Sequence, residues 1–204
     1  AMEKVLLGCG AWGAQLLPGI VMPQVTEYVR RECRHVILSA EEGSLDAYLR
    51  GRREMGSNVI VNQLGEAVLG EREAGNRLEA ILKRLTDPRI DRVSVKISAV
   101  VSQVYVVAYE ATLALFKERL RRLYDTAIKY GGNQPKSITL DMEEYRDLPL
   151  TLDAFKQVLD EKPYEKLEGG IVLQAYLPDS WPALRELTDW ARTRKARTGA
   201  GIRL

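Results

Sequence analysis

The segment SVKIS, residues 94–98, closes a short apolar run with a charged residue, Lys96. Three later segments repeat this arrangement, namely ITLDMEEY with Asp141, GIVLQAY with Gln174 and GIRL with Arg203. In a (β/α)8 barrel the functional groups come from the carboxyl ends of several parallel strands, so one polar residue after each apolar run is the expected pattern. The sequence therefore predicts a site at the carboxyl end of a parallel sheet.

Strand-like and helix-like segments alternate through the second part of the chain. Short apolar runs predict strands at residues 57–62, 92–97, 136–141, 170–174 and 200–204. Helical spacing of apolar residues predicts helices at residues 71–85, 109–130, 151–159 and 181–193. Thr151 is the expected N-cap of the third helix. Repeated β/α units with nearly continuous apolar strands imply a parallel sheet. The predicted fold class is α/β, an incomplete (β/α)8 barrel of about five units.

Residues 1–56 are predicted to form a helical arm that packs against the partial barrel of residues 57–204. Its amphipathic stretches are residues 22–33 and 44–55.

The segment KVLLGCGAWG, residues 4–13, also fits the G-x-G-x-x-G pattern of a dinucleotide-binding loop. Pro18 and Pro23 follow it, where the crossover helix of such a loop would run without interruption. Proline costs about 3 kcal/mol in a helix interior. These prolines therefore disfavour the nucleotide-loop interpretation.

The charge of the chain is nearly balanced. Its 30 basic and 28 acidic residues give a formal net charge of +2, which predicts no strong field for nucleic acid or an anionic membrane. The basic run KERLRR, residues 117–122, has Phe116, Leu120 and Leu123 at helical spacing beneath it. We expect this run to be a solvated helix face.

Cysteine, histidine and long apolar segments are scarce. Cys9 and Cys33 are too few for a disulfide framework, which favours a reducing, cytoplasmic compartment. His35 is the sole histidine, so no metal site is expected. No apolar run approaches the roughly 18 residues that a membrane-spanning helix needs.

Five motifs resemble, in order and spacing, those of the proline dehydrogenase domain, in the form found in bifunctional proline utilisation A proteins. They are LGEAVLGE, VSVKISAVVSQ, LDMEEYRDL, LTLDAFKQVLD and GIVLQAYLPDS, which lie between residues 57 and 204. The resemblance implies an FAD-dependent enzyme that oxidises L-proline to 1-pyrroline-5-carboxylate by hydride transfer to flavin N5.

The resemblance also implies roles for the four strand-end residues. Lys96 would contribute to binding the proline carboxylate, and Asp141 would belong to the charge network of the substrate pocket. Gln174 and Arg203 would hydrogen-bond the isoalloxazine, with the arginine near N5. For Lys96, Asp141 or Arg203 taken alone, a structural ion-pair network is an equally good explanation. Glu143 and Glu144 are expected in the loop after the strand, and at least one of them is expected to be a solvated or supporting carboxylate.

In this family a quinone accepts the electrons, so the resemblance implies a cytoplasmic enzyme with peripheral contact to the inner face of the membrane. The three further strands of the family's barrel would carry paired arginines that hold the proline carboxylate. The first and fifth strands would be open edges, which favours self-association.

Two other functions remain open at this point. Lys96, with Asp141 nearby, could form a Schiff base with a carbonyl substrate, as in lysine-dependent aldolases built on this fold. The chain could also be a non-catalytic fragment or assembly scaffold, which would bind no FAD.

Overall fold

The computed structural model describes residues 15–34, 37–38, 42–63, 68, 70–105 and 107–204. The chain forms two compact units, Ala1–Asn58 and Val59–Leu204. The boundary between them lies beside the predicted division between residues 56 and 57. The glycine-rich segment 4–13 and His35 fall outside the described residues.

The described residues of the first unit include helices α2 (Pro18–Cys33) and α3 (Glu42–Glu54), which overlap the two predicted amphipathic stretches. Helix α2 continues through Pro23, so the predicted proline interruption is wrong. Pro18 lies in the first turn, where a backbone N–H has no helical acceptor. Pro23 lacks one backbone N–H and so removes only one backbone bond from a helix of 16 residues.

The second unit is built on a four-stranded sheet in the order β1-β2-β3-β4. All three neighbouring pairs are parallel, which confirms the predicted parallel sheet. The strands are β1 (Val61–Asn62), β2 (Arg92–Lys96), β3 (Ser137–Asp141) and β4 (Gly170–Ile171). The helices are α4 (Glu71–Thr86), α5 (Ile97–Val100), α6 (Tyr109–Lys129), α7 (Leu148–Leu159) and α8 (Ser180–Thr198), and a 3-10 turn, η1 (Tyr145–Asp147), precedes α7.

Three predicted strands are shorter than expected. The first and the fourth are reduced to two residues each. The fifth is a single parallel bridge between Gly170 and Arg203. A β-prone sequence counts as a strand only where a neighbour supplies matching backbone groups, so propensity alone overestimates these lengths.

Helix α7 begins before the predicted position. Its first residue is Leu148 and its N-cap is Asp147, so the prediction of Thr151 as the cap is wrong. Pro149 explains the earlier start, because proline has no N–H to lose and its fixed φ suits the first helical turn. Thr151 is instead buried inside the helix, with 1% of its surface exposed.

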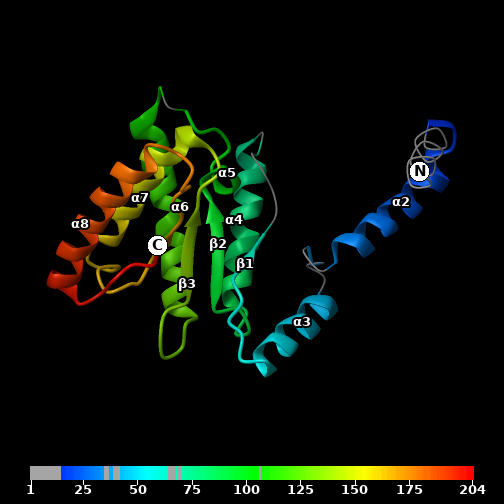
Figure 1. The fold of residues 1–204 in the computed structure, drawn as a ribbon, viewed down its shortest axis with the longest axis horizontal. Helices are drawn as coiled ribbons and strands as arrows, with labels where there is room; N and C mark the ends of the chain where they lie inside the picture. Colours follow the sequence, from blue (N-terminus) through cyan, green and yellow to red (C-terminus); the bar gives the residue numbers. More distant parts are fainter. Residues whose placement is uncertain (1–14, 35–36, 39–41, 64–67, 69, 106) are drawn as a thin grey trace. The chain divides into compact units, whose positions relative to one another are not determined.

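The helices α4, α6, α7 and α8 lie side by side around the sheet (Figure 1). Buried and less buried residues alternate along β2, where Val93 and Val95 are buried, and along the end of β3, where Leu140 is buried. Side chains along a strand point to opposite faces in turn, so the intervening residues, such as Lys96 and Asp141, share the other face. The sheet therefore has an apolar face in the protein core and a second face that is largely polar.

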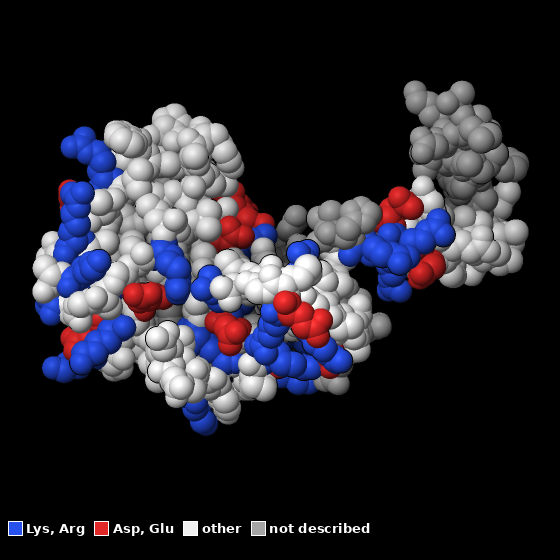
Figure 2. Space-filling view, turned by 60° about the horizontal axis from the view of Figure 1, so that its bottom comes forward, with Lys and Arg blue, Asp and Glu red and all other residues white. Residues whose placement is uncertain are grey.

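The outer surface of the helix layer carries ion pairs that join α6 to neighbouring segments. Arg121 of α6 donates to Glu161 at 2.7 and 2.9 Å, and Arg122 pairs with Glu79 of α4. On the face shown in Figure 2, basic and acidic side chains are interspersed. None of the helices that the structure describes is long and apolar enough to cross a membrane.

The basic run at residues 117–122 is not wholly solvated. Arg119 is 6% exposed and pairs with Glu71, so the prediction of a solvated face is wrong at this position. Helix α6 lies between α4 and α7, and its buried surface is wider than the predicted apolar stripe. Burial lowers the pKa of the Arg119 guanidinium.

Candidate active site

Lys96 and Asp141 are neighbours at the carboxyl ends of β2 and β3, where they are partners in the strand register. The Lys96 side chain is 13% exposed and its Nζ donates to Oε1 of Glu143. The second oxygen of this carboxylate, Oε2, accepts from Ser98 Oγ at 3.4 Å. Asp141 Oδ1 accepts from the backbone N–H of Met142 at 3.0 Å.

Gln174 reaches the same cluster from the turn after β4. Its Nε2 donates to the backbone oxygen of Glu143 at 3.0 Å. The turn itself is held by Ser180, whose Oγ donates to the Gln174 backbone oxygen at 2.6 Å. The structure thus brings three of the four predicted residues, Lys96, Asp141 and Gln174, to one end of the sheet. We call these three residues and Glu143 the carboxyl-end cluster.

Arg203 lies elsewhere. Its backbone pairs with Gly170. Its guanidinium Nη2 donates to Ser137 Oγ and, at 2.8 Å, to the backbone oxygen of Glu168. Ser137 starts β3 and Glu168 precedes β4, so the guanidinium is directed toward the amino end of the sheet. Its predicted contact with flavin stays a prediction and requires the side chain to leave Ser137.

The family model for proline dehydrogenase matches residues 46–204. The structure of proline utilization A from Corynebacterium freiburgense matches the chain with a TM-score of 0.79 and 41% sequence identity, over 93% of this chain and 20% of that one. The chain belongs to the proline dehydrogenase family. Its parallel sheet and surrounding helices are accordingly part of the (β/α)8 barrel that the sequence predicted.

Other solved members agree with this assignment. Proline utilization A from Bdellovibrio bacteriovorus, inactivated by N-propargylglycine, matches with a TM-score of 0.75 and 27% identity, over 87% of this chain and 20% of that one. A Bradyrhizobium japonicum proline utilization A variant, at 18% identity and a TM-score of 0.58 over 72% of this chain and 15% of that one, shares the fold. No curated protein matches the chain. The chain spans about a fifth of the length of the first two solved relatives.

Glu143 was expected in the loop after the strand, with at least one of Glu143 and Glu144 a solvated or supporting carboxylate, but its pairing with Lys96 was not predicted for this proline dehydrogenase family member. The alternation of apolar and acidic residues after β3 could have indicated the direction of the Glu143 side chain. Met142, between Asp141 and Glu143, is buried with 6% of its surface exposed. An extended backbone that buries residue 142 directs residues 141 and 143 to the opposite side. Asp141 and Glu143 therefore share the side on which Lys96 lies.

Asp147, an acidic residue next to the carboxyl-end cluster, is buried. Asp147 is 2% exposed, and its Oδ1 has no hydrogen-bond partner, although Arg146 Nε lies 3.8 Å away. Burial, together with the negative charges of Glu144 and Glu143, raises the pKa of Asp147 to about 6, against the opposing effect of Arg146. One turn later, Thr151 Oγ1 is also buried without a partner.

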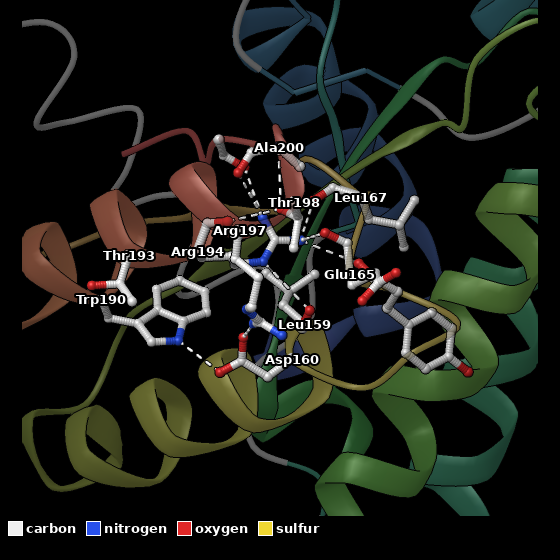
Figure 3. Close-up of polar contacts among 12 residues, drawn as sticks. Leu159, Asp160, Glu165, Leu167, Trp190, Thr193, Arg194, Arg197, Thr198 and Ala200 are labelled. Atoms are coloured by element: carbon white, nitrogen blue, oxygen red, sulfur yellow. Dashed lines mark hydrogen bonds and ion pairs between the residues drawn. The ribbon is translucent and has the colours of Figure 1, made fainter.

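The opposite end of the sheet is organised by Arg194 of α8, which the sequence did not indicate (Figure 3). The side chain is 1% exposed, and all five of its closest acceptors are backbone oxygens. They belong to Leu167 at 2.7 Å, Glu165 at 3.0 Å, and Tyr164, Ala200 and Gly201 at 3.2 Å. Arg194 therefore joins the loop before β4 to the segment that carries Arg203.

The described residues contain no group of three or more histidine, cysteine or acidic side chains that could hold a metal ion. Cys33, the cysteine within the described part of the chain, is not in a disulfide.

Proposed function

We propose that this chain provides part of the site of an L-proline dehydrogenase, which oxidises L-proline to 1-pyrroline-5-carboxylate with FAD as the hydride acceptor. The observation that carries the proposal is the carboxyl-end cluster, since Lys96, Asp141 and Gln174 meet where a barrel of this family would place its chemistry. Membership of the proline dehydrogenase family supports the same activity.

The cluster has the charges that a zwitterionic amino acid needs. The Lys96 ammonium would attract the carboxylate of proline, and Asp141 and Glu143 make the surroundings of the ammonium net negative. These carboxylates would attract the protonated amine of proline, and one of them would accept the proton that the amine must lose before a hydride can leave the neighbouring carbon. The protein thus orients the substrate by both of its charged ends.

The residues present fit a flavin at one of the two predicted contacts. Flavin presents ring nitrogens and carbonyl oxygens, and the carboxamide of Gln174 lies beside the substrate cluster with the matching donor and acceptor groups. Arg203 would contribute a cation but is bound to Ser137 at the other end of the sheet. When bound, FAD would supply the hydride acceptor, and the polar face of the sheet would hold it.

The partners and location follow from this activity and are proposals too. L-proline is the substrate, a quinone takes the electrons from reduced flavin, and the intact enzyme is cytoplasmic with peripheral contact to the inner face of the membrane. Self-association would use the edge strand β1, whose outer backbone groups have no strand partner among the described residues.

The test is an anaerobic titration of the FAD-loaded chain with L-proline, followed by the visible flavin absorption. The control is Lys156→Met, at a lysine of α7 that pairs with Glu186 of α8. Bleaching that disappears in Lys96→Met but persists in Lys156→Met would support the proposal. Retained flavin that does not respond to proline would contradict it. Failure to retain FAD would favour the fragment or scaffold alternative. A borohydride-trapped adduct of an aldehyde on Lys96 would favour the aldolase.

A further inference from the structure

Glu143 contacts two residues to which the proposed function gives different roles. Its carboxylate accepts from Lys96, a predicted substrate-binding residue, and its backbone oxygen accepts from Gln174, a predicted cofactor-binding residue. Lys96 and Gln174 come from β2 and from the turn after β4, which are separated in the sheet by β3. Glu143 is thus the link between two separate parts of the site.

The geometry holds Glu143 at both its side chain and its main chain. One carboxylate oxygen faces Lys96 and the other faces Ser98 Oγ at 3.4 Å, so both oxygens are directed at the junction of β2 and α5. Gln174 holds the backbone at 3.0 Å. A lysine has four flexible methylene groups, and a charge-assisted hydrogen bond is the contact that can select one position for its ammonium.

We propose that Glu143 is a positioning residue: it fixes the Lys96 ammonium for the carboxylate of the substrate, and Gln174 fixes Glu143 through its backbone. The cofactor side and the substrate side of the site are thereby one hydrogen-bonded unit. The consequence for proline rests on the proposed function, whereas the fixing of Lys96 does not.

The first experiment measures Lys96 without using enzyme activity. The chain is treated with an acetylating reagent, and the labelling rate of each lysine is read by peptide mass spectrometry. Loss of the carboxylate in Glu143→Gln should accelerate Lys96 labelling about two- to fivefold, the range for a partly exposed ion pair. Glu143→Asp should recover part of the slow rate, and Gln174→Ala should give a smaller acceleration.

A matched control uses the ion pair between Lys156 and Glu186, on the outside of α7 and α8. Glu186→Gln should leave Lys96 labelling unchanged. Circular dichroism confirms that each variant is folded. Ser98→Ala provides an independent perturbation, because it removes the second donor to the Glu143 carboxylate. Unchanged Lys96 labelling in both Glu143→Gln and Ser98→Ala overturns the inference.

The second experiment is the proline titration of the FAD-loaded chain. In Glu143→Gln the half-saturating L-proline concentration should rise about three- to tenfold, with less than about a twofold change in the maximal bleaching rate, as expected for lost binding. If Lys96 labelling responds while wild-type flavin ignores proline, the proposed function fails and the fixing of Lys96 stands. If labelling responds and proline bleaches both proteins identically, the coupling to substrate is overturned.

Discussion

The two ends of the sheet differ in how their charged side chains are satisfied, although the buried Tyr124 hydroxyl near Arg194 also has no hydrogen-bond partner. At the amino end, Arg194 is almost fully buried and its guanidinium donates to backbone oxygens from three segments. At the carboxyl end, Lys96 has one carboxylate, and the buried Asp147 and Thr151 each keep an atom without a hydrogen-bond partner. Satisfied polar networks stabilise a fold, while unsatisfied groups cost stability. The difference indicates that Arg194 stabilises the amino end, whereas the carboxyl end, which holds the proposed site, keeps unsatisfied groups.

The largest expected effect is at Arg194. Arg194→Met should lower the free energy of unfolding by about 3–5 kcal/mol, because several buried backbone oxygens lose their donor and no water can replace it. Urea denaturation measures the change. Arg192→Met, on the same helix with 78% of its side chain exposed, is the matched control and should cost less than about 0.5 kcal/mol.

Arg194→Lys sharpens this prediction. An ammonium keeps the charge but has three donors, against five on a guanidinium, so the loss should be intermediate. If Arg194→Met is as stable as the wild type, the relief from burying a charge outweighs the lost hydrogen bonds. In that case the amino end is not the stabilising end of the sheet.

At the carboxyl end, a substitution of Asp147 should raise the free energy of unfolding and not lower it. Its raised pKa means that the folded state holds a proton more tightly than the unfolded state. The stabilising contribution is present below about pH 4 and is lost as the pH rises through about 6. Asp147→Asn has no such loss, so above pH 6 it should exceed the wild type by up to about 3 kcal/mol.

The measurement for Asp147→Asn is a set of urea midpoints between pH 4 and pH 8. Glu161→Gln is a control of opposite sign, because the hydrogen bond from Arg121 lowers the pKa of Glu161. That variant should be less stable than the wild type at pH 7, with the difference shrinking as the pH falls. A pH-independent difference for Asp147→Asn would show that its burial does not disfavour the charge.

Thr151 should give a smaller effect of the same sign. Thr151→Val removes a buried hydroxyl that has no partner and keeps the branched shape, so a gain of about 1 kcal/mol is expected. Thr112→Val is the control, because Thr112 is also buried but its Oγ1 donates to the Ala108 backbone oxygen at 3.0 Å. A gain in both variants would mean that the hydroxyl bond itself has little value.

The two ends also differ in how well the sequence predicted them. Strands β2 and β3 and helices α4 and α6 were predictable because local apolar periodicity determines which face is buried. The pattern of one polar residue after each apolar run identified Lys96, Asp141 and Gln174, since parallel strands bring their carboxyl ends together. Their roles toward proline and flavin remain predictions.

The amino end was not predictable in the same way. Arg194 binds backbone oxygens, which every residue possesses, so no residue type marks its partners. The partner of Glu143 was not predicted, because Lys96 lies 47 positions away and the pairing depends on the order of the strands. Arg203 was expected to direct its side chain to the carboxyl end of the sheet. The pattern of a polar residue after each apolar run gives the position of a residue, but it does not give the direction of a long side chain.

The smallest expected effect concerns the direction of the Arg203 side chain. Ser137→Ala removes one acceptor of the guanidinium while the backbone oxygen of Glu168 remains, so stability without FAD should fall by about 0.5–1 kcal/mol. If FAD draws Arg203 toward the carboxyl end, the contact with Ser137 is broken in the complex, and the variant should bind FAD more tightly than the wild type by the same amount. Equal FAD affinity in the two proteins would mean that Arg203 stays at the amino end and belongs, with Arg194, to the stabilising side of the sheet.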